Sequence, residues 1–275
     1  SADLKEFVEK NHLNLSQDGT FNPRDIFGSH DDSDHVYNTP RAWYMARCLN
    51  PSTMNWDGPD ADFTPLSDDI PWCMVPEKKV TIEDVKYVLS SHFQGTPYDP
   101  YASYGDKSMK GAYRAIGVNR TDFLGIIQMR PDAGEDSRAI EWVAFASNVF
   151  NTAAPVYTDV EKVPEYFSNT TGDASTDNFY WASRMIAAMA DASYSKSIFH
   201  IERYQERVMS KGHEYINQYD ELLAKESNAE KRMQLRQEAN EKIADMVKKE
   251  TQDTLNKVLY ELSNQMKNAY SRSDA

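Results

Sequence analysis

The sequence predicts an α+β fold, on the basis of two patterns in different parts of the chain. Residues 121–129 and 138–146 are rich in β-branched and aromatic side chains, and the turn-forming segment R-P-D-A-G-E-D separates them. The last eighty residues instead repeat apolar side chains at helical spacing. We therefore expect an antiparallel β-hairpin near the middle of the chain and helices after it.

The N-terminal part is predicted to hold short helices and ordered loops. Residues 1–15 carry apolar side chains at helical spacing, and Ser1 lies where an N-cap would be. Residues 16–75 are rich in Asp, Asn, Pro and Ser, but they also contain Trp43, Trp56 and Trp72. Because aromatic side chains favour packing, this segment is expected to be ordered and not a disordered linker.

A helix is predicted to begin at Thr81. The sequence T-I-E-D approximates a capping box in which Asp84 takes the place of Glu, and Gly95 and Pro97 end the helix. The apolar side chains that form one face of this helix are Ile82, Val85, Val88 and Leu89.

Further helices are predicted in the C-terminal part. Residues 176–193 have helical spacing, with Ser175 or Thr176 as the N-cap. Two amphipathic stretches follow, and Ser227 with Glu230 matches the S-x-x-E capping box at the start of the second. The chain is predicted to turn there and to end as an antiparallel helical hairpin. The apolar positions of the hairpin are Ile201, Tyr204, Val208, Tyr215, Tyr219 and Leu222, then Leu235, Ile243, Met246, Val247, Val258, Leu262 and Met266.

Composition limits the classes of function. A chain of 275 residues with 40% hydrophobic side chains can bury a sizeable core. The formal net charge of −13 opposes binding to nucleic acids and to anionic membrane surfaces, because both carry negative charge. No stretch approaches the roughly 20 apolar residues that cross a bilayer. Two cysteines are too few for a disulfide framework, so we expect a protein of the reducing cytoplasm.

Two groups of residues are candidates for chemistry by their type alone. His30 and His35 flank an acidic run, and imidazole with carboxylate binds zinc or another divalent ion. Their spacing matches no standard ligand motif, however, and the same run suits Asx and ST turns. Cys48 and Cys73 lie in no recognisable nucleophile motif and are interpreted as packing residues. The signatures of serine hydrolases, nucleotide-binding loops and zincins are absent from the sequence.

Six long segments of the chain carry a resemblance to a known family. They are S-H-D-D-S-D-H-V-Y-N-T-P-R-A-W-Y-M at 29–45, P-E-K-K-V-T-I-E-D-V at 76–85, S-S-H-F-Q-G-T-P-Y-D-P-Y at 90–101, Y-R-A-I-G-V-N-R-T-D-F-L at 113–124, W-V-A-F-A-S-N-V-F-N-T-A-A-P-V-Y at 142–157 and S-T-D-N-F-Y-W-A-S-R-M-I-A-A-M-A-D at 175–191. Together they resemble the bacterial dipeptidases among the N-terminal nucleophile (Ntn) cysteine hydrolases. The resemblance covers nearly the whole chain.

The resemblance implies a thiol nucleophile at the first residue of the mature enzyme, with the α-amino group of that residue as the base. Attack on the peptide carbonyl gives a thioester, and water then releases the N-terminal amino acid of a dipeptide, without a metal or an organic cofactor. Ser1 and the residues after it resemble the middle of such enzymes. We therefore expect an upstream part with the nucleophilic cysteine to be missing, and the chain alone to be inactive.

The resemblance also points to auxiliary catalytic residues. Arg120 in V-N-R-T, just before a predicted strand, is the main candidate for an arginine that orients the nucleophile or polarises the carbonyl. Arg114 is the alternative, and a surface ion pair would explain either arginine without catalysis. Asn119 is a candidate donor to the oxyanion, although an Asn at a strand entry needs no such role.

Three residues of the segment 29–45 are candidates for substrate binding. Asn38, Arg41 and Trp43 are expected to line or brace the pocket, because an arginine can hold the carboxylate of a dipeptide through two hydrogen bonds. Packing and turn formation are the favoured explanation of the same residues.

By resemblance, the fold is part of an αββα sandwich with antiparallel strands. Residues 1–174 would belong to the hydrolase domain and 175–275 to a helical region that ends in the hairpin. A partial sandwich exposes sheet edges and one apolar face, so we expect it to pair with the missing half or with a second copy of the chain. Two other hypotheses remain: a metal-dependent hydrolase that uses His30 and His35, and a non-catalytic α+β module that binds a partner through the hairpin.

Overall fold

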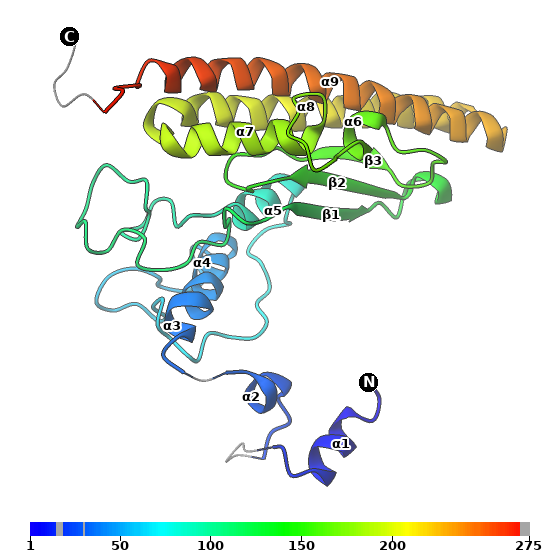
Figure 1. Ribbon diagram of the computed structural model, residues 1–275. Coiled ribbons are helices and arrows are strands. Elements are labelled where there is room, and N and C mark those ends of the chain that lie inside the picture. The colour runs from blue at the N-terminus through cyan, green and yellow to red at the C-terminus, as the bar shows by residue number, and fades with distance from the viewer. Residues whose placement is uncertain (15–18, 30, 270–275) are drawn as a thin grey trace. The chain divides into compact units, whose positions relative to one another are not determined.

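The computed structural model in Figure 1 describes residues 1–14, 19–29 and 31–269. The chain divides into two compact units, Ser1–Glu77 and Lys78–Ala275. The first consists of short helices joined by loops, and the second contains a sheet and the long helices. The predicted α+β fold class is therefore confirmed.

The first unit has an aromatic core. The indole N–H of Trp43 donates to the carbonyl oxygen of Phe63 at 3.1 Å, and that of Trp56 donates to the carbonyl oxygen of Asn50 at 2.7 Å. Both indole rings are buried, as the prediction of ordered loops with short helices requires, whereas the third tryptophan of that prediction, Trp72, is 58% exposed. The helices of this unit are α1 (Leu4–Lys10), α2 (Pro23–Phe27), α3 (Asp34–Tyr37) and α4 (Thr39–Leu49).

The second unit begins with the helix predicted at Thr81, which is α5 (Ile82–Leu89). The hydroxyl of Thr81 accepts the backbone N–H of Asp84 at 3.1 Å, and the carboxylate of Asp84 accepts the backbone N–H of Thr81 at 3.0 Å. The predicted capping box is therefore present.

Three strands form one antiparallel sheet in the order β1-β2-β3. The first two, β1 (Phe123–Met129) and β2 (Ala139–Phe145), are the predicted hairpin, and a 3-10 helix (Glu135–Ser137) lies in their connection. The third strand, β3 (Ala154–Tyr157), was not predicted. It contains Pro155, and a proline in a sequence argues against a strand. An edge strand tolerates proline, because on its outer side the missing N–H removes no hydrogen bond of the sheet.

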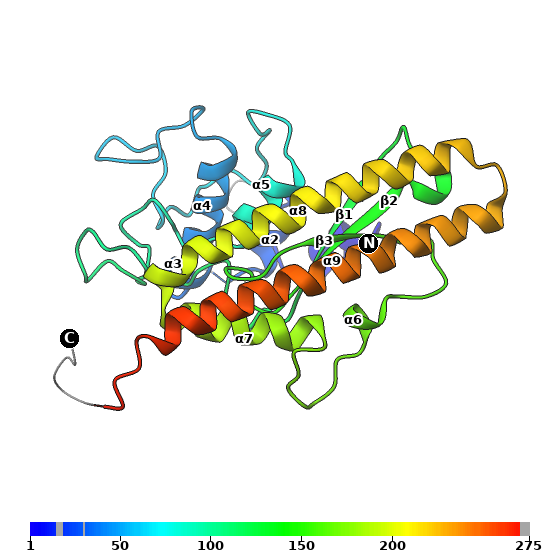
Figure 2. The same cartoon turned by 90° about the horizontal axis from the view of Figure 1, so that it is seen from above.

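The predicted helical hairpin is confirmed as α8 (Tyr194–Lys225) and α9 (Ala229–Ser263). These two helices cross one face of the sheet, and α7 (Phe179–Ala192) lies beside them, as Figures 1 and 2 show. A short helix, α6 (Glu165–Ser168), precedes α7. The core between sheet and helices includes Ile126, Ile140, Trp142, Tyr157, Tyr204, Ile216, Ile243 and Val247. None of the described helices is both long and apolar enough to cross a membrane.

The N-caps of three helices lie one to three residues after the predicted positions. The side-chain oxygen of Asn178 accepts the N–H of Trp181 at 2.8 Å at the start of α7, and that of Asn228 accepts the N–H of Lys231 at 3.0 Å at the start of α9. Each Asn lies directly before the first helical residue, where a strong N-cap residue acts. The predicted caps Ser1, Ser175, Thr176 and Ser227 lie outside these positions, and Asp3 precedes α1.

On the second face of the sheet, apolar side chains of β1 are exposed within unit 2. Along β1, Ile126 points toward the helices, whereas Phe123, Ile127 and Met129 are 52%, 69% and 61% exposed. The alternation follows from the two-residue period of a strand. Phe145 of β2 borders this surface, because its ring lies 5.6 Å from that of Phe123 and 5.4 Å from that of Phe179 in the core. Among the described residues of this unit, one apolar face and the free edge of β1 thus remain open.

Helix α8 approaches the edge strand most closely at Gly212. A Cβ atom at this position would lie 2.6 Å from Cδ of Pro155 in β3. We expect Gly212→Ala to lower the free energy of unfolding by about 1–3 kcal/mol, because the clash outweighs the better helix propensity of Ala. Urea denaturation measures the change. Gly172→Ala, where a Cβ meets nothing within 4 Å, is the matched control and should leave stability equal or slightly higher; a Gly212→Ala protein as stable as this control would contradict the expectation.

Candidate functional site

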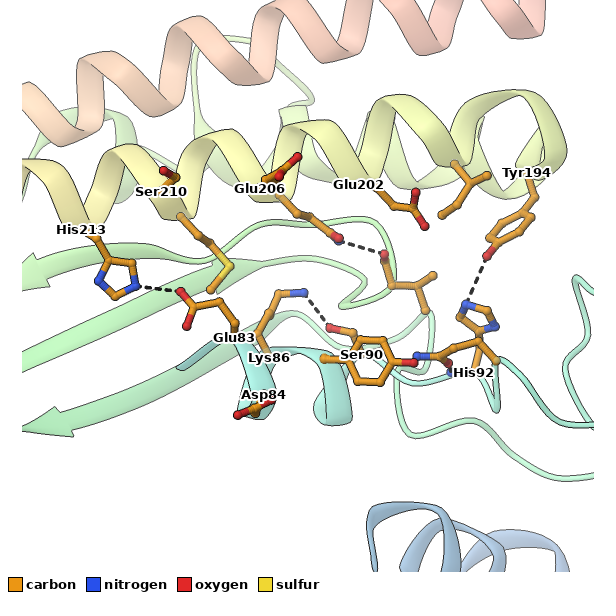
Figure 3. A pocket seen from close by; sticks show the side chains of 16 residues that line it. Glu83, Asp84, Lys86, Ser90, His92, Tyr194, Glu202, Glu206, Ser210 and His213 are labelled. Carbon is orange, nitrogen blue, oxygen red and sulfur yellow. Dashed lines mark hydrogen bonds and ion pairs between the residues drawn. The ribbon is translucent and has the colours of Figure 1, made fainter. Parts of the chain in front are cut away.

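A cavity of about 850 Å³ lies between α5 and α8 in unit 2 (Figure 3). One wall comes from α5 and the residues after it, and the other from the N-terminal half of α8. The cavity is lined by acidic, basic and apolar side chains together. The lining includes Glu83, Lys86, Ser90, Val149, Ile198, Glu202, Glu206 and Met209.

Lys86 is the buried cation of this cavity, with 4% of its surface exposed. Because Ile82 lies one helical turn before it, the lysine follows the apolar stripe of α5 inward. Its Nζ donates to Oγ of Ser90 at 2.6 Å and to the carbonyl oxygen of Asn148 at 2.8 Å. Burial lowers the pKa of this amine to about 7. Near neutral pH, Lys86 can therefore exchange a proton or bind an anion.

Histidines join the two walls at both ends of the cavity. At one end, Nε2 of His213 lies 2.7 Å from Oε1 of Glu83. At the other end, Nε2 of His92 lies 3.2 Å from the hydroxyl of Tyr194, while its Nδ1 lies 2.9 Å from Oδ1 of Asp99. A carboxylate on one ring nitrogen and a hydroxyl on the other fix the orientation of the His92 imidazole. The two contacts hold α8 against α5 and set the length of the cavity.

A smaller cavity of about 330 Å³ lies beside Asn119, which was predicted as an oxyanion donor. Its lining also includes Tyr101, Arg184 and Asp191. The hydroxyl of Tyr101 donates to Oδ1 of Asp191 at 2.5 Å, and burial, followed by this carboxylate, raises the pKa of Tyr101. The ring of Tyr101 stacks on Tyr194 with centroids 3.9 Å apart, so one aromatic pair separates the two cavities.

The structure places the predicted catalytic residues at the entry to β1. Asn119 and Arg120 are both exposed, and only Asn119 lines the smaller cavity. The guanidinium in that lining belongs to Arg184, which lies 3.5 Å from a carboxylate oxygen of Asp122. Arg114, the alternative arginine, is partly buried. The catalytic roles of these residues stay predictions.

The predicted substrate-binding residues all lie in unit 1. Asn38 donates to the carboxylate of Asp34, and Arg41 donates to the carbonyl oxygen of Tyr37 and, at 3.2 Å, to the side-chain oxygen of Asn38. Trp43 is part of the aromatic core. Their contacts brace α3 and α4, and a role in binding substrate stays a prediction.

Cys48 does not have the environment of an activated nucleophile. Cys48 is partly buried, and burial raises the pKa of its thiol, although Tyr44 and Arg47 act in the opposite direction. A nucleophilic thiol requires a lowered pKa. Cys73 is exposed, and no disulfide joins it to Cys48.

The proposed metal site gains no support. His30 lies outside the described residues. Nε2 of His35 lies 3.1 Å from Oδ1 of Asp68, which is a single carboxylate contact. Within residues 1–14, 19–29 and 31–269, no three His, Cys, Asp or Glu side chains gather in a way that could hold an ion.

Sequence reasoning did not single out Lys86, His92 or Asp99. A signal for Lys86 was present, because positions 82, 86 and 89 share one face of a helix that is otherwise apolar there. His92 and Asp99 lie in the segment S-S-H-F-Q-G-T-P-Y-D-P-Y, which was noted only for its resemblance.

Comparison with known proteins gives the family. Residues 1–207 match the model of peptidase family C69. The chain is 46% identical over 313 residues to a dipeptidase of Bifidobacterium longum (strain NCC 2705), an alignment that covers 100% of this chain and 59% of the relative. It is 45% identical over 276 residues to the probable dipeptidase A of Streptococcus pyogenes serotype M18 (strain MGAS8232), with 100% and 56% covered.

A more distant relative, the probable dipeptidase B of Lactococcus lactis subsp. lactis (strain IL1403), is 33% identical over 278 residues, with 100% of this chain and 56% of the relative covered. The chain thus spans a little over half the length of these curated relatives. All three relatives bear the name of a peptide-cleaving enzyme, so the hypothesis of a non-catalytic interaction module gains no support. The chain belongs to peptidase family C69.

Proposed function

We propose that this chain works as part of a cysteine-type dipeptidase that hydrolyses dipeptides to free amino acids. The observation that carries the proposal is the match of the whole chain to relatives named as dipeptidases, at 45–46% identity. The nucleophile is assigned to a cysteine outside these 275 residues, because the thiol of Cys48 is deactivated by burial and no motif surrounds Cys73.

In this proposal the α-amino group of that cysteine accepts the thiol proton, and the thiolate attacks the peptide carbonyl. The C-terminal amino acid leaves as an amine, and water hydrolyses the thioester to release the N-terminal amino acid. Asn119 donates its side-chain N–H to the oxyanion, a contact worth about 3 kcal/mol in the transition state. Arg120 orients the nucleophile or polarises the carbonyl. The reaction uses no metal or organic cofactor.

The uncovered face of the sheet supports the four-layer sandwich implied by the resemblance. Phe123, Ile127 and Met129 form an apolar surface that water would otherwise contact. A second sheet, contributed by the missing half or by another copy, would bury this surface and protect the edge of β1. On this proposal residues 1–174 belong to the hydrolase domain, and 175–275 form its helical region. We also propose a cytoplasmic location, because two cysteines are too few for a disulfide framework.

The substrate is held by its carboxylate in this proposal. Arg41 binds the carboxylate of the dipeptide, with Asn38 and Trp43 bracing it, once the guanidinium exchanges its contact with the carbonyl of Tyr37 for the ligand.

Turnover of a dipeptide by two forms of the protein tests the proposal. We expect hydrolysis by the chain extended upstream to its natural start and none by the 275-residue chain, and thiol alkylation should abolish the activity of the extended form. In the extended form, Arg120→Ala should lower kcat/KM about 100-fold or more if the arginine acts on the reacting groups. Arg138→Ala, an exposed arginine of the β1–β2 connection, is the matched control. Turnover by the 275-residue chain would contradict the placement of the nucleophile, and inactivity of both forms would contradict the function itself.

A further inference from the structure

Lys86 is a buried cation without a carboxylate partner. Its two hydrogen bonds go to the neutral oxygens of Ser90 and Asn148, and no carboxylate among the described residues forms an ion pair with it. An ammonium group carries three N–H donors, so one is left for a further acceptor. A buried charge without a counter-charge is unfavourable, and an anion that enters the cavity would relieve this cost.

The opposite wall carries carboxylates without cationic partners. Glu202 and Glu206 lie one turn apart on α8, and neither forms an ion pair with a residue in the part of the chain that the structure describes. Figure 3 shows the carboxylate of Glu202 extending from α8 into the space that Lys86 faces from α5. Burial, followed by the negative charges of Asp99 and Glu202, raises the pKa of Tyr194 to about 12. Figure 3 shows Glu202 on the part of α8 between Glu206 and Tyr194.

The remaining acids of the cavity are already engaged. Glu83 contacts His213, and Asp84 accepts the backbone N–H of Thr81 and lies 3.2 Å from Nζ of Lys78. The carboxylates left for a ligand therefore lie on α8, across the cavity from Lys86.

Apolar side chains complete the lining. Val149, Ile198 and Met209 contribute to the same cavity, and its volume of about 850 Å³ exceeds the size of one amino acid. A ligand that satisfies all three features has a carboxylate for Lys86, an ammonium for α8 and an aliphatic side chain for the apolar wall.

We propose that this cavity binds a free α-amino acid with an aliphatic side chain. Its carboxylate pairs with Lys86, its ammonium group pairs with Glu202, and its side chain packs against Val149, Ile198 and Met209. A phosphate or another simple anion is disfavoured, because Glu202 and Glu206 repel it. A simple cation is disfavoured, because it leaves Lys86 unpaired and adds a like charge near it. The inference does not depend on the proposed function, since it concerns binding and requires no turnover.

Isothermal titration calorimetry of the 275-residue chain with four probes tests this inference. The probes are L-leucine, 4-methylpentanoate, which lacks the ammonium group, 3-methylbutylamine, which lacks the carboxylate, and glycyl-L-leucine. We expect leucine to bind at least about tenfold more tightly than either single-charge analogue. Of these three probes, only leucine carries both the carboxylate that pairs with Lys86 and the ammonium group that pairs with Glu202. Tighter binding of glycyl-leucine than of leucine would overturn the assignment to a free amino acid.

Two variants locate the charges of the ligand. Glu202→Gln should remove the advantage of leucine over 4-methylpentanoate, and Lys86→Met should remove its advantage over 3-methylbutylamine. Glu202 is exposed, so its substitution tests the site even if Lys86→Met fails to fold. Lys196→Met, an exposed lysine of α8, is the control and should bind leucine as the parent does. Absence of leucine binding to the parent chain, or equal binding by parent and both variants, would overturn the inference; loss of dipeptide turnover with leucine binding intact would affect only the proposed function.

Discussion

The free energy of unfolding of the protein is expected to rise between about pH 7 and pH 10.5 by several kcal/mol more than that of the Lys86→Met variant. Burial lowers the pKa of Lys86 from 10.5 to about 7, and each pKa unit corresponds to about 1.4 kcal/mol. Between these two pKa values the unfolded chain binds the proton and the folded chain releases it, so stability increases with pH. This gain in the free energy of unfolding is complete above the pKa of the lysine in the unfolded chain, and it is lost as the pH falls toward 7.

Urea denaturation at several pH values in this range measures the effect as the difference between parent and variant. Methionine keeps an unbranched side chain of similar length but cannot titrate, so the slopes of the other groups cancel. Lys196→Met, at an exposed position of α8, controls for the loss of one positive charge. Equal pH slopes for the parent and Lys86→Met would mean that the amine stays protonated in the folded state, and the account of its burial would then be wrong.

Local signals in the sequence predicted most of the elements of unit 2. The capping box at Thr81 and the alternating runs on either side of R-P-D-A-G-E-D depend on neighbours in sequence, and α5, β1 and β2 formed where they were expected. The edge strand β3 was missed because its pairing with β2 is a tertiary contact and Pro155 conceals it. The cap of α9 was misplaced by one residue because Ser227 and Asn228 are both good caps, and sequence alone does not rank them.

The cavity could not be predicted from the sequence for a different reason. Lys86 meets the carbonyl oxygen of Asn148, which lies 62 residues away in the chain, and His92 meets Tyr194, which lies 102 residues away. The spacing of apolar residues along the sequence does not indicate contacts between residues so far apart in the chain. Asn119 could be located by its place before a strand, and it does line a cavity, but the charged residues that share this cavity, Arg184 and Asp191, come from α7.

Asp136→Ala is expected to lower the free energy of unfolding by about 3 kcal/mol, because it leaves a buried guanidinium without its main partner. Asp136 lies in the connection between β1 and β2, and its carboxylate accepts from Arg232 at 2.5 and 2.7 Å and from Arg236 at 2.5 Å. Arg236 is only 3% exposed, and its other carboxylate partner, Asp159, is largely exposed. The aspartate therefore joins the sheet hairpin to α9.

The pH dependence of the same variant gives an independent test. The hydrogen bonds from Arg232, together with the charge of Arg236, hold the pKa of Asp136 below its ordinary value of 3.8. This interaction stabilises the fold above the unfolded pKa and is lost as the pH falls through the folded pKa, so the parent and Asp136→Ala should converge in stability in acid. Asp132→Ala, at an exposed position of the same connection, is the control for removing one negative charge. If Asp136→Ala were no less stable than this control at neutral pH, Arg236 would have to be satisfied by Asp159 and the backbone alone, and the anchoring of the hairpin to α9 would rest on apolar packing between the sheet and the helices.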